Sequence, residues 1–207
     1  EEYQISLSAA NQGEATTLAG SGTATFANGT GTAASFYLPK GITSDGTNLY
    51  VSDGNHTIRK IVISTKEVST IAGSNPSGYI DGDGTAAKFN YPWGITTDGT
   101  NLYVGDGDNN MVRKIVISTG VVSTLAGSGN IGSEDGTGTD TSFQMPKGLI
   151  LVGTNLYVGD YRNKKIRKID LSKKETTLVA LHNLDDDFPA TPQVTVNGLL
   201  SNSGTLS

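Results

Sequence analysis

The sequence predicts an all-β protein assembled from tandem copies of one four-stranded antiparallel sheet. The main observation is an internal repeat: related segments start at Pro39, Pro92 and Pro146, which are 53 and then 54 residues apart. Within each copy, apolar and polar residues alternate along short runs, as they do in half-buried strands. The composition agrees, because 27 of the 207 residues are Gly and only 35% are hydrophobic, which suits short strands joined by turns.

Four strands are expected in each copy, and the first copy shows them most clearly. They cover residues 40–44, 48–52, 57–64 and 68–72, with Asp, Gly and Asn in the turns between them. The run 57–64 carries apolar residues of both parities, which indicates that neighbours cover both faces of the sheet. Tandem four-stranded meanders that cover one another are the blades of a β-propeller. Three complete blades are therefore predicted, at about residues 17–70, 70–124 and 124–178.

The repeated strings resemble the NHL repeat, a family named after its Asn-His-Leu signature. Residues 41–61 carry the motif Gly-Ile-Thr-x-Asp-Gly-x-Asn-Leu-Tyr-Val-x-Asp and then Asn-His-x-Ile-Arg-Lys-Ile, and the block before them is similar to the extended form common in bacterial NHL proteins. The signature His is His56 in the first copy but Asn110 in the second and Lys164 in the third. The resemblance covers about residues 14–178 and implies an NHL-type propeller whose first strands line a channel.

Partial blade strands are expected at both ends of the repeat. After an N-terminal segment at 1–13, residues 14–21 match the end of a fourth strand that lacks the three strands before it. Residues 181–207 form a loosened tail, read either as the start of a fourth blade or as a linker to another module. Three blades cannot close a ring that needs about four to eight, so further blades are expected from a longer chain or from another subunit.

Composition disfavours several classes of partner. The net charge of −5 and the pI near 4.9 argue against nucleic acid. No apolar run approaches the roughly 20 residues that span a bilayer. The chain starts at Glu1 rather than Met, which fits a mature secreted protein or an excised segment, and we expect an extracellular or periplasmic location.

No catalytic set is visible. The resemblance brings in relatives that are zinc lyases or calcium-dependent hydrolases, but this chain offers only His56 and His182, too few for a zinc site. There is no Cys, and no Ser lies in a Gly-x-Ser-x-Gly elbow. Asp81 and Asp83 are a weak calcium candidate, because a turn in which Asp or Asn bonds its own backbone explains the same positions in all three copies. No other cofactor is expected.

The recurrent charged residues are assigned to the scaffold. Asp53, Asp106 and Asp160 end the second strand of each copy, where a carboxylate accepts N–H groups of the following turn. Each third strand carries an adjacent Arg and Lys, and adjacent strand residues point to opposite faces. We therefore expect these cations to pack between blades and pair with carboxylates, not to form one basic patch. The pairs are Arg59-Lys60, Arg113-Lys114 and Arg167-Lys168.

Positions where the copies differ are better site candidates than positions where they agree. The mouth of the first strand holds Lys40, Trp93 or Lys147, and Tyr91 adds a second aromatic residue in the second copy. Tyr91 and Trp93 are predicted to form an aromatic platform for a sugar or peptide, flanked by the two lysines. The alternative is that Trp93 fills the gap between blades.

The sequence therefore favours a non-enzymatic binding or assembly scaffold that recognises protein or glycan through its loops and channel mouth. One alternative is a propeller lyase or hydrolase whose metal-binding blades are missing from this chain. A second is a structural subunit of an extracellular polymer, in which an incomplete blade accepts a neighbour's strand.

Overall fold

The computed structural model describes residues 13–173. The chain divides into one compact unit that ends at Ile169 and a second that begins at Asp170. The sheets belong to the first unit, apart from the last residue of β13. Within the described residues every helix is a 3-10 turn of three residues, and none is long and apolar enough to cross a membrane.

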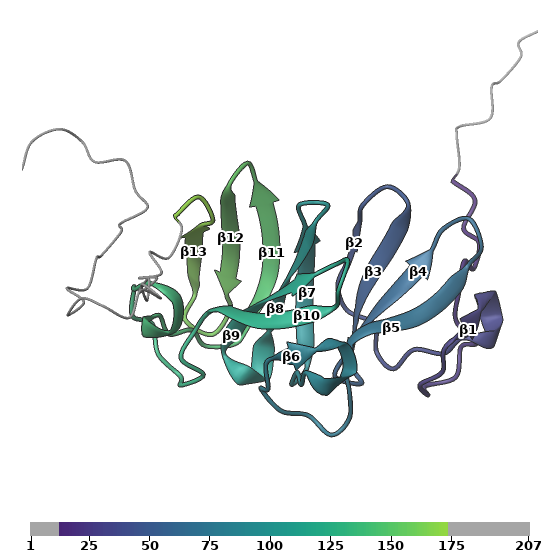
Figure 1. The fold of residues 1–207 in the computed structure, drawn as a ribbon, viewed down its shortest axis with the longest axis horizontal. Helices are drawn as coiled ribbons and strands as arrows, with labels where there is room; N and C mark the ends of the chain where they lie inside the picture. The colour runs from purple at the N-terminus through teal and green to yellow at the C-terminus, as the bar shows by residue number, and fades with distance from the viewer. Residues whose placement is uncertain (1–12, 174–207) are drawn as a thin grey trace, which may run out of the picture. The chain divides into compact units, whose positions relative to one another are not determined.

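The structure is all-β, and its antiparallel sheets follow the repeat (Figure 1). The first sheet contains β1 (Gly29–Thr30), β2 (Ile42–Ser44), β3 (Asn48–Asp53), β4 (Thr57–Val62) and β5 (Glu67–Gly73). The second contains β6 (Gly82–Asp83), β7 (Pro92–Thr97), β8 (Asn101–Asp106), β9 (Met111–Val116) and β10 (Val121–Ala126). The third contains β11 (Pro146–Val152), β12 (Asn155–Asp160) and β13 (Lys165–Asp170). The four strands predicted in each of the first two copies are confirmed, with ends shifted by one or two residues in the first.

Two short strands were not predicted. β1 pairs with the outer strand β5, and β6 pairs with β10, so each of these sheets gains a fifth strand at its outer edge. A 3-10 turn follows each of them directly: η1 (Gly31–Ala33) after β1 and η2 (Gly84–Ala86) after β6. The loop that leads into each blade thus covers part of the outer edge of its own sheet, where unpaired backbone groups would otherwise be exposed.

The predicted lone strand at 14–21 does not form. No strand among the described residues pairs with this segment, and a strand without a partner has no ladder of hydrogen bonds to hold it. Gly20 N–H instead donates to Gly31 O at 3.1 Å, and Leu18 and Ala19 pack on the apolar face of the first sheet. The tail at 181–207 and the fourth strand of the third copy lie outside the described residues.

The core lies between neighbouring sheets, as stacked blades require. Tyr50, Ile58 and Ala72 of the first sheet pack on Ile95, Leu102 and Val104 of the second. The first strands of the sheets also meet, because β7 contacts both β2 and β11. This convergence places the residues at the start of the three first strands next to one another.

Candidate ligand-binding site

A buried Arg–Asp pair in each blade fixes the segment that leads to the mouth of the first strand. The pairs are Arg59–Asp53 at 3.2 Å, Arg113–Asp106 at 2.9 Å and Arg167–Asp160 at 3.1 Å. The other carboxylate oxygen of each Asp accepts a backbone N–H at 2.8 Å from Tyr37, Asn90 or Gln144, 16 residues upstream. These residues therefore belong to the scaffold, as predicted, although the bond reaches the preceding loop and not only the following turn.

The electrostatics of the second pair follow from its burial. Asp106 is fully buried, and this desolvation raises its pKa to about 6, while Arg113 and the N–H donors of Asn90 and Asn109 act in the opposite direction. Three donors around one carboxylate are what a buried charge needs to remain in the interior. The pair holds the loop in place, and its carboxylate is not open to a ligand.

The structure brings the four predicted mouth residues together. The Lys40 Nζ lies 4.5 Å from the centroid of the Tyr91 ring and 4.1 Å from that of Trp93. The Lys147 Nζ lies 3.9 Å from the Trp93 centroid and 3.8 Å from that of Tyr161. We call Lys40, Tyr91, Trp93, Lys147 and Tyr161 the mouth cluster. The lysines rest on the rings in cation–π geometry and do not merely flank an open platform.

Close approach of the backbones explains this convergence. A Cβ at Gly41 would lie 2.4 Å from Trp93 O, and a Cβ at Gly94 would lie 2.1 Å from Lys147 O. Gly after the mouth residue is thus required where one first strand touches the next. Side chains 40, 93 and 147 are neighbours as a result.

Trp93 also fills space between structural elements. A Cβ at Gly107 would lie 2.5 Å from Trp93 Cδ1, and the indole Nε1 is buried without a hydrogen-bond partner in the described part of the chain. The packing interpretation of Trp93 therefore describes part of its environment. One edge of the Trp93 indole packs against the backbone at Gly107, while the ammonium groups of Lys40 and Lys147 lie over its ring.

Tyr161 was missed by the sequence reasoning. It follows Asp160 at the position held by Gly54 and Gly107 in the other copies, so it is one of the places where the repeat breaks. Tyr161 is 59% exposed, and Tyr91 is 37% exposed. The cluster consequently has an accessible aromatic residue at each end.

The two lysines are not neutralised by carboxylates in ion-pair contact. Across residues 13–169 the ion pairs belong to Arg59, Arg113 and Arg167. Burial lowers the pKa of Lys40, and the charge of Lys147 lowers it further, whereas Asp108 and Asp53 raise it. Two half-buried cations thus share one small region of an acidic protein.

His56 is a turn residue, as predicted, and it also links two blades. Its backbone is left-handed, with φ of 63°, and its Nδ1 accepts the N–H of Tyr91 at 3.1 Å. The imidazole packs edge-to-face on the Tyr91 ring at 4.8 Å. Asn110 makes the equivalent bond, from its Oδ1 to the N–H of Met145 at 3.1 Å. His182 lies outside the described residues.

Asp81 and Asp83, the two calcium candidates, differ in their contacts and exposure. The Asp81 carboxylate accepts Arg113 Nη2 and the Thr124 N–H, and Asn28 and Asp135 likewise accept an Arg Nη2 in their copies. Asp83 is exposed at the end of β6. Residues 13–173 contain no group of three or more His, Cys, Asp or Glu that could hold a metal ion.

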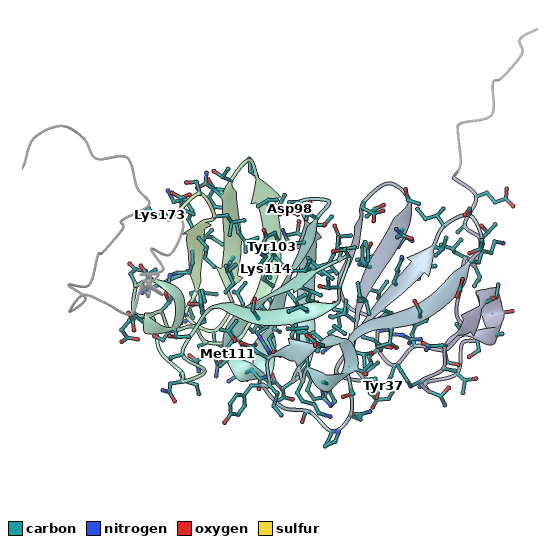
Figure 2. All side chains as sticks on the ribbon, viewed as in Figure 1. Tyr37, Asp98, Tyr103, Met111, Lys114 and Lys173 are labelled. Carbon is teal, nitrogen blue, oxygen red and sulfur yellow. The ribbon has the colours of Figure 1, made fainter. Side chains whose placement is uncertain are left out.

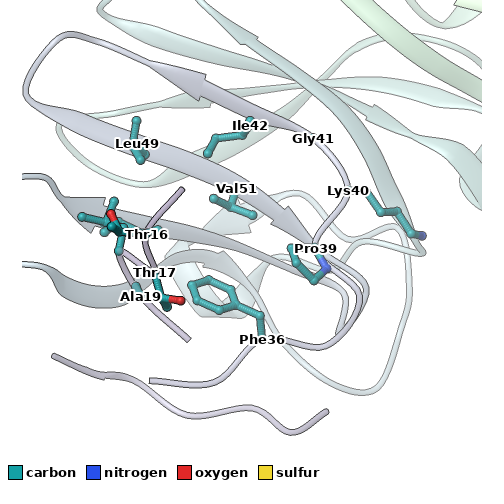
Figure 3. Close-up of a pocket in the computed structure, with 12 residues that line it drawn as sticks. Thr16, Thr17, Ala19, Phe36, Pro39, Lys40, Gly41, Ile42, Leu49 and Val51 are labelled. Carbon is teal, nitrogen blue, oxygen red and sulfur yellow. The ribbon is translucent and has the colours of Figure 1, made fainter. Parts of the chain in front are cut away.

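Two hollows lie beside the cluster. A pocket of about 420 Å³ covers the apolar face of the first sheet, lined by residues such as Phe36, Ile42, Leu49 and Val51 (Figure 3). Lys40 stands at its rim with the ammonium directed away. A smaller hollow of about 180 Å³ lies between the second and third blades, lined by Gly107, Asp108, Asn110, Ile131, Gln144, Met145 and Arg162.

Comparisons with known proteins agree with the repeat. No protein-family model matches the chain. It is 32% identical over 163 residues to NHL repeat-containing protein 2 of Bos taurus, which covers 70% of this chain and 22% of that protein. Among solved structures, a Bacteroides thetaiotaomicron protein of unknown function has a TM-score of 0.54 and 31% identity, covering 58% of this chain and 32% of its own. An auxiliary nutrient binding protein from Bacteroides ovatus has a TM-score of 0.52 and 25% identity, covering 59% and 34%.

The stacked antiparallel blades and their buried Arg–Asp pairs define a β-propeller protein. With these relatives, the chain belongs to the NHL-repeat proteins. It spans about a fifth of the length of the curated relative and about a third of the solved chains.

Proposed function

We propose that this chain is a non-enzymatic binding scaffold of a secreted bacterial protein, acting in the extracellular space or the periplasm, and that its mouth cluster recognises a protein or glycan partner. The observation that carries the proposal is the convergence of Lys40, Trp93 and Lys147 from three blades on one small surface. Rigid loops on a propeller are suitable for recognition. The solved relative named as an auxiliary nutrient binding protein supports a binding role.

We further propose that further blades complete the propeller, supplied by a longer chain or by another subunit, and that one of them covers the first sheet. The first sheet packs on an apolar face of the second sheet. The first sheet has an equivalent apolar face of its own, which lines the larger pocket. Ile42 is 61% exposed, whereas Ile95, its counterpart in the next repeat, is 6% exposed. This contrast is what a missing neighbour blade would produce.

The binding proposal is tested with mixed arrays of immobilised glycans and peptides. Labelled wild-type chain is expected to bind a subset of the array, and Trp93→Ala and Tyr91→Ala are expected to lose that binding while keeping a cooperative thermal transition. Binding that persists in both variants would exclude the mouth cluster as the site.

A second variant displaces the Trp93 indole without replacing Trp93. Gly107→Ala places a methyl group against Trp93 Cδ1, so we expect the indole to move, the fluorescence of this single Trp to shift and array binding to fall. Gly159→Ala is the control, because a Cβ there meets no atom closer than 3.7 Å. Equal effects of the two Gly variants would contradict a role for the placement of Trp93.

A further inference from the structure

We propose that the mouth cluster recognises a carboxylated oligosaccharide. The ammonium groups of Lys40 and Lys147 each receive a sugar carboxylate, and the exposed parts of Tyr91 and Tyr161 pack against sugar rings. This inference rests on the binding function proposed above and narrows its ligand to one chemical class.

The charge of the cluster selects an anion. The two ammonium groups lie 4.1 and 3.9 Å from the centroid of the same Trp93 ring, and they repel, because the charge of Lys147 lowers the pKa of Lys40. The carboxylates that the structure pairs with cations across residues 13–169 are taken by the arginines. A ligand carboxylate at each ammonium group relieves this repulsion and forms charge-assisted hydrogen bonds.

The negative charge of the rest of the chain confines anion binding to the mouth cluster. The chain carries a net charge of −5, which repels anions from most of its surface. Asp108, which raises the pKa of Lys40, also lines the smaller hollow and sets a limit on how many negative charges the site accepts. A ligand with spaced single carboxylates fits this pattern better than a densely charged one.

The aromatic ends suit sugar rings. Trp93 is covered by the two ammonium groups, but Tyr161 is 59% exposed and Tyr91 is 37% exposed. Their apolar ring surfaces can pack on the C–H faces of a sugar, while their hydroxyl groups can form hydrogen bonds. Rings and cations alternate along the cluster, in the order Tyr91, Lys40, Trp93, Lys147 and Tyr161. Contacts for sugar faces therefore alternate with contacts for carboxylates.

The hollow beside the cluster adds polar contacts for hydroxyl groups. Gly107 belongs to this hollow and also touches Trp93, and Arg162 follows Tyr161 directly. Asp108, Gln144 and Arg162 supply acceptors and donors in its wall. Polar wall groups of this kind fix the orientation of a hydroxyl-rich ligand.

The test measures binding of the full chain to defined oligosaccharides by titration calorimetry, without divalent cations. An oligogalacturonate is compared with its carboxyl-reduced counterpart of the same length and with polyglutamate. We expect the oligogalacturonate to bind best and to weaken as salt is added, because exposed charges are screened. Lys40→Gln and Lys147→Gln are each expected to weaken it by about tenfold or more, and Tyr161→Ala is expected to weaken it as well.

Lys114→Gln is the matched control for charge. It removes the same unit of charge from β9, where Lys114 stands opposite Tyr103 of β8 (Figure 2). The mouth lies at the other end of β8, where Asp106 stands opposite Pro92. The oligogalacturonate affinity of this variant should equal that of the wild type. A loss as large as that of Lys147→Gln would mean that net charge alone attracts the ligand, and would overturn the site.

The other outcomes separate this inference from the proposed function. Equal binding of the carboxyl-reduced oligosaccharide would overturn the carboxylate contact, and tighter binding of polyglutamate would overturn the sugar in favour of an acidic protein. No binding of oligogalacturonate, together with Trp93-dependent binding to neutral glycans or peptides on the array, would overturn this inference and leave the binding scaffold standing. Loss of Trp93-dependent array binding as well would remove both.

Discussion

The residue before each third strand adopts a left-handed conformation, with φ of 63°, 55° and 57° at His56, Asn110 and Lys164. In the first two copies its side chain accepts an N–H from the next blade, at Tyr91 or Met145. The two donor residues, Tyr91 and Met145, also have positive φ, of 49° and 60°, and such non-Gly positions persist only where contacts hold them. The signature position of the repeat is therefore an inter-blade link, and the ammonium of Lys164 cannot accept such a bond.

We expect the His56 link to weaken in acid. Burial lowers the pKa of His56, Lys40 lowers it further and Asp108 opposes them, so the folded state favours the neutral ring that accepts at Nδ1. Its contribution is complete above the ordinary pKa of about 6.5 and is lost as the pH falls through the lowered folded value. At pH 7, His56→Ala should cost ~1 kcal/mol of unfolding free energy, measured by urea denaturation.

His56→Asn is the control that the chain itself supplies, because Asn110 makes the same bond in the second copy. This variant should retain its stability at pH 7 and lose less than the wild type between pH 7 and pH 5. Identical acid sensitivity in the two proteins would show that another group causes it.

At the scale of the element, each blade is held by the Arg on its third strand. Arg113 on β9 reaches Asp106 at the end of β8, Lys88 O in the preceding loop and Ile80 O near β6. One guanidinium therefore ties two strands to the long loop that carries the mouth. The neighbouring Lys114 is only half-buried and lies on the other face of the strand.

Arg113→Met should reduce the unfolding free energy by about 3–5 kcal/mol, because it leaves Asp106 buried without its cation. Lys114→Met removes the same charge from the adjacent position and should change stability by less than about 0.5 kcal/mol. Urea denaturation of both variants at pH 7.5 gives the comparison. Similar losses would indicate that the buried pair adds little to stability.

The elements were largely predictable because their signals are local. Alternation along Asn48–Asp53 and the turn residues after it depend on neighbouring residues alone, and the repeat supplied each signal more than once. β1 was missed because Gly29–Thr30 is too short to show alternation, and the strand at 14–21 was wrong because strand formation there requires a distant partner. The convergence of Lys40, Trp93 and Lys147 was predictable from their repeat positions, whereas Tyr161 joins them through Lys147 of its own blade, at a position that is Gly in the other two copies.

At the scale of the whole molecule, equivalent residues have different surroundings. Ile95, Leu102 and Val104 are buried against the first sheet, while Ile42 at the equivalent position of the first sheet is largely exposed. The repeat makes the blades alike in sequence, but the described residues cover only some of their faces.

Ile95→Ala and Ile42→Ala form a matched pair at one repeat position. We expect Ile95→Ala to cost about 2–5 kcal/mol, as a large-to-small change in a packed core does, and Ile42→Ala to cost less than about 1 kcal/mol, both measured by urea denaturation. An equal loss at Ile42 would show that its face is covered in solution, as it would be by another blade.

The hydrogen bonds of the buried arginines affect how the number of blades can change in evolution. Arg59 reaches Ala27 O, Asn28, Ser35 O and Asp53, so its partners lie within the same repeat. Arg113 and Arg167 repeat this closed set in their own copies. Duplication of one 53-residue stretch therefore copies a blade whose buried charges are already paired, and a gene can gain or lose blades without separating any buried charge from its partner.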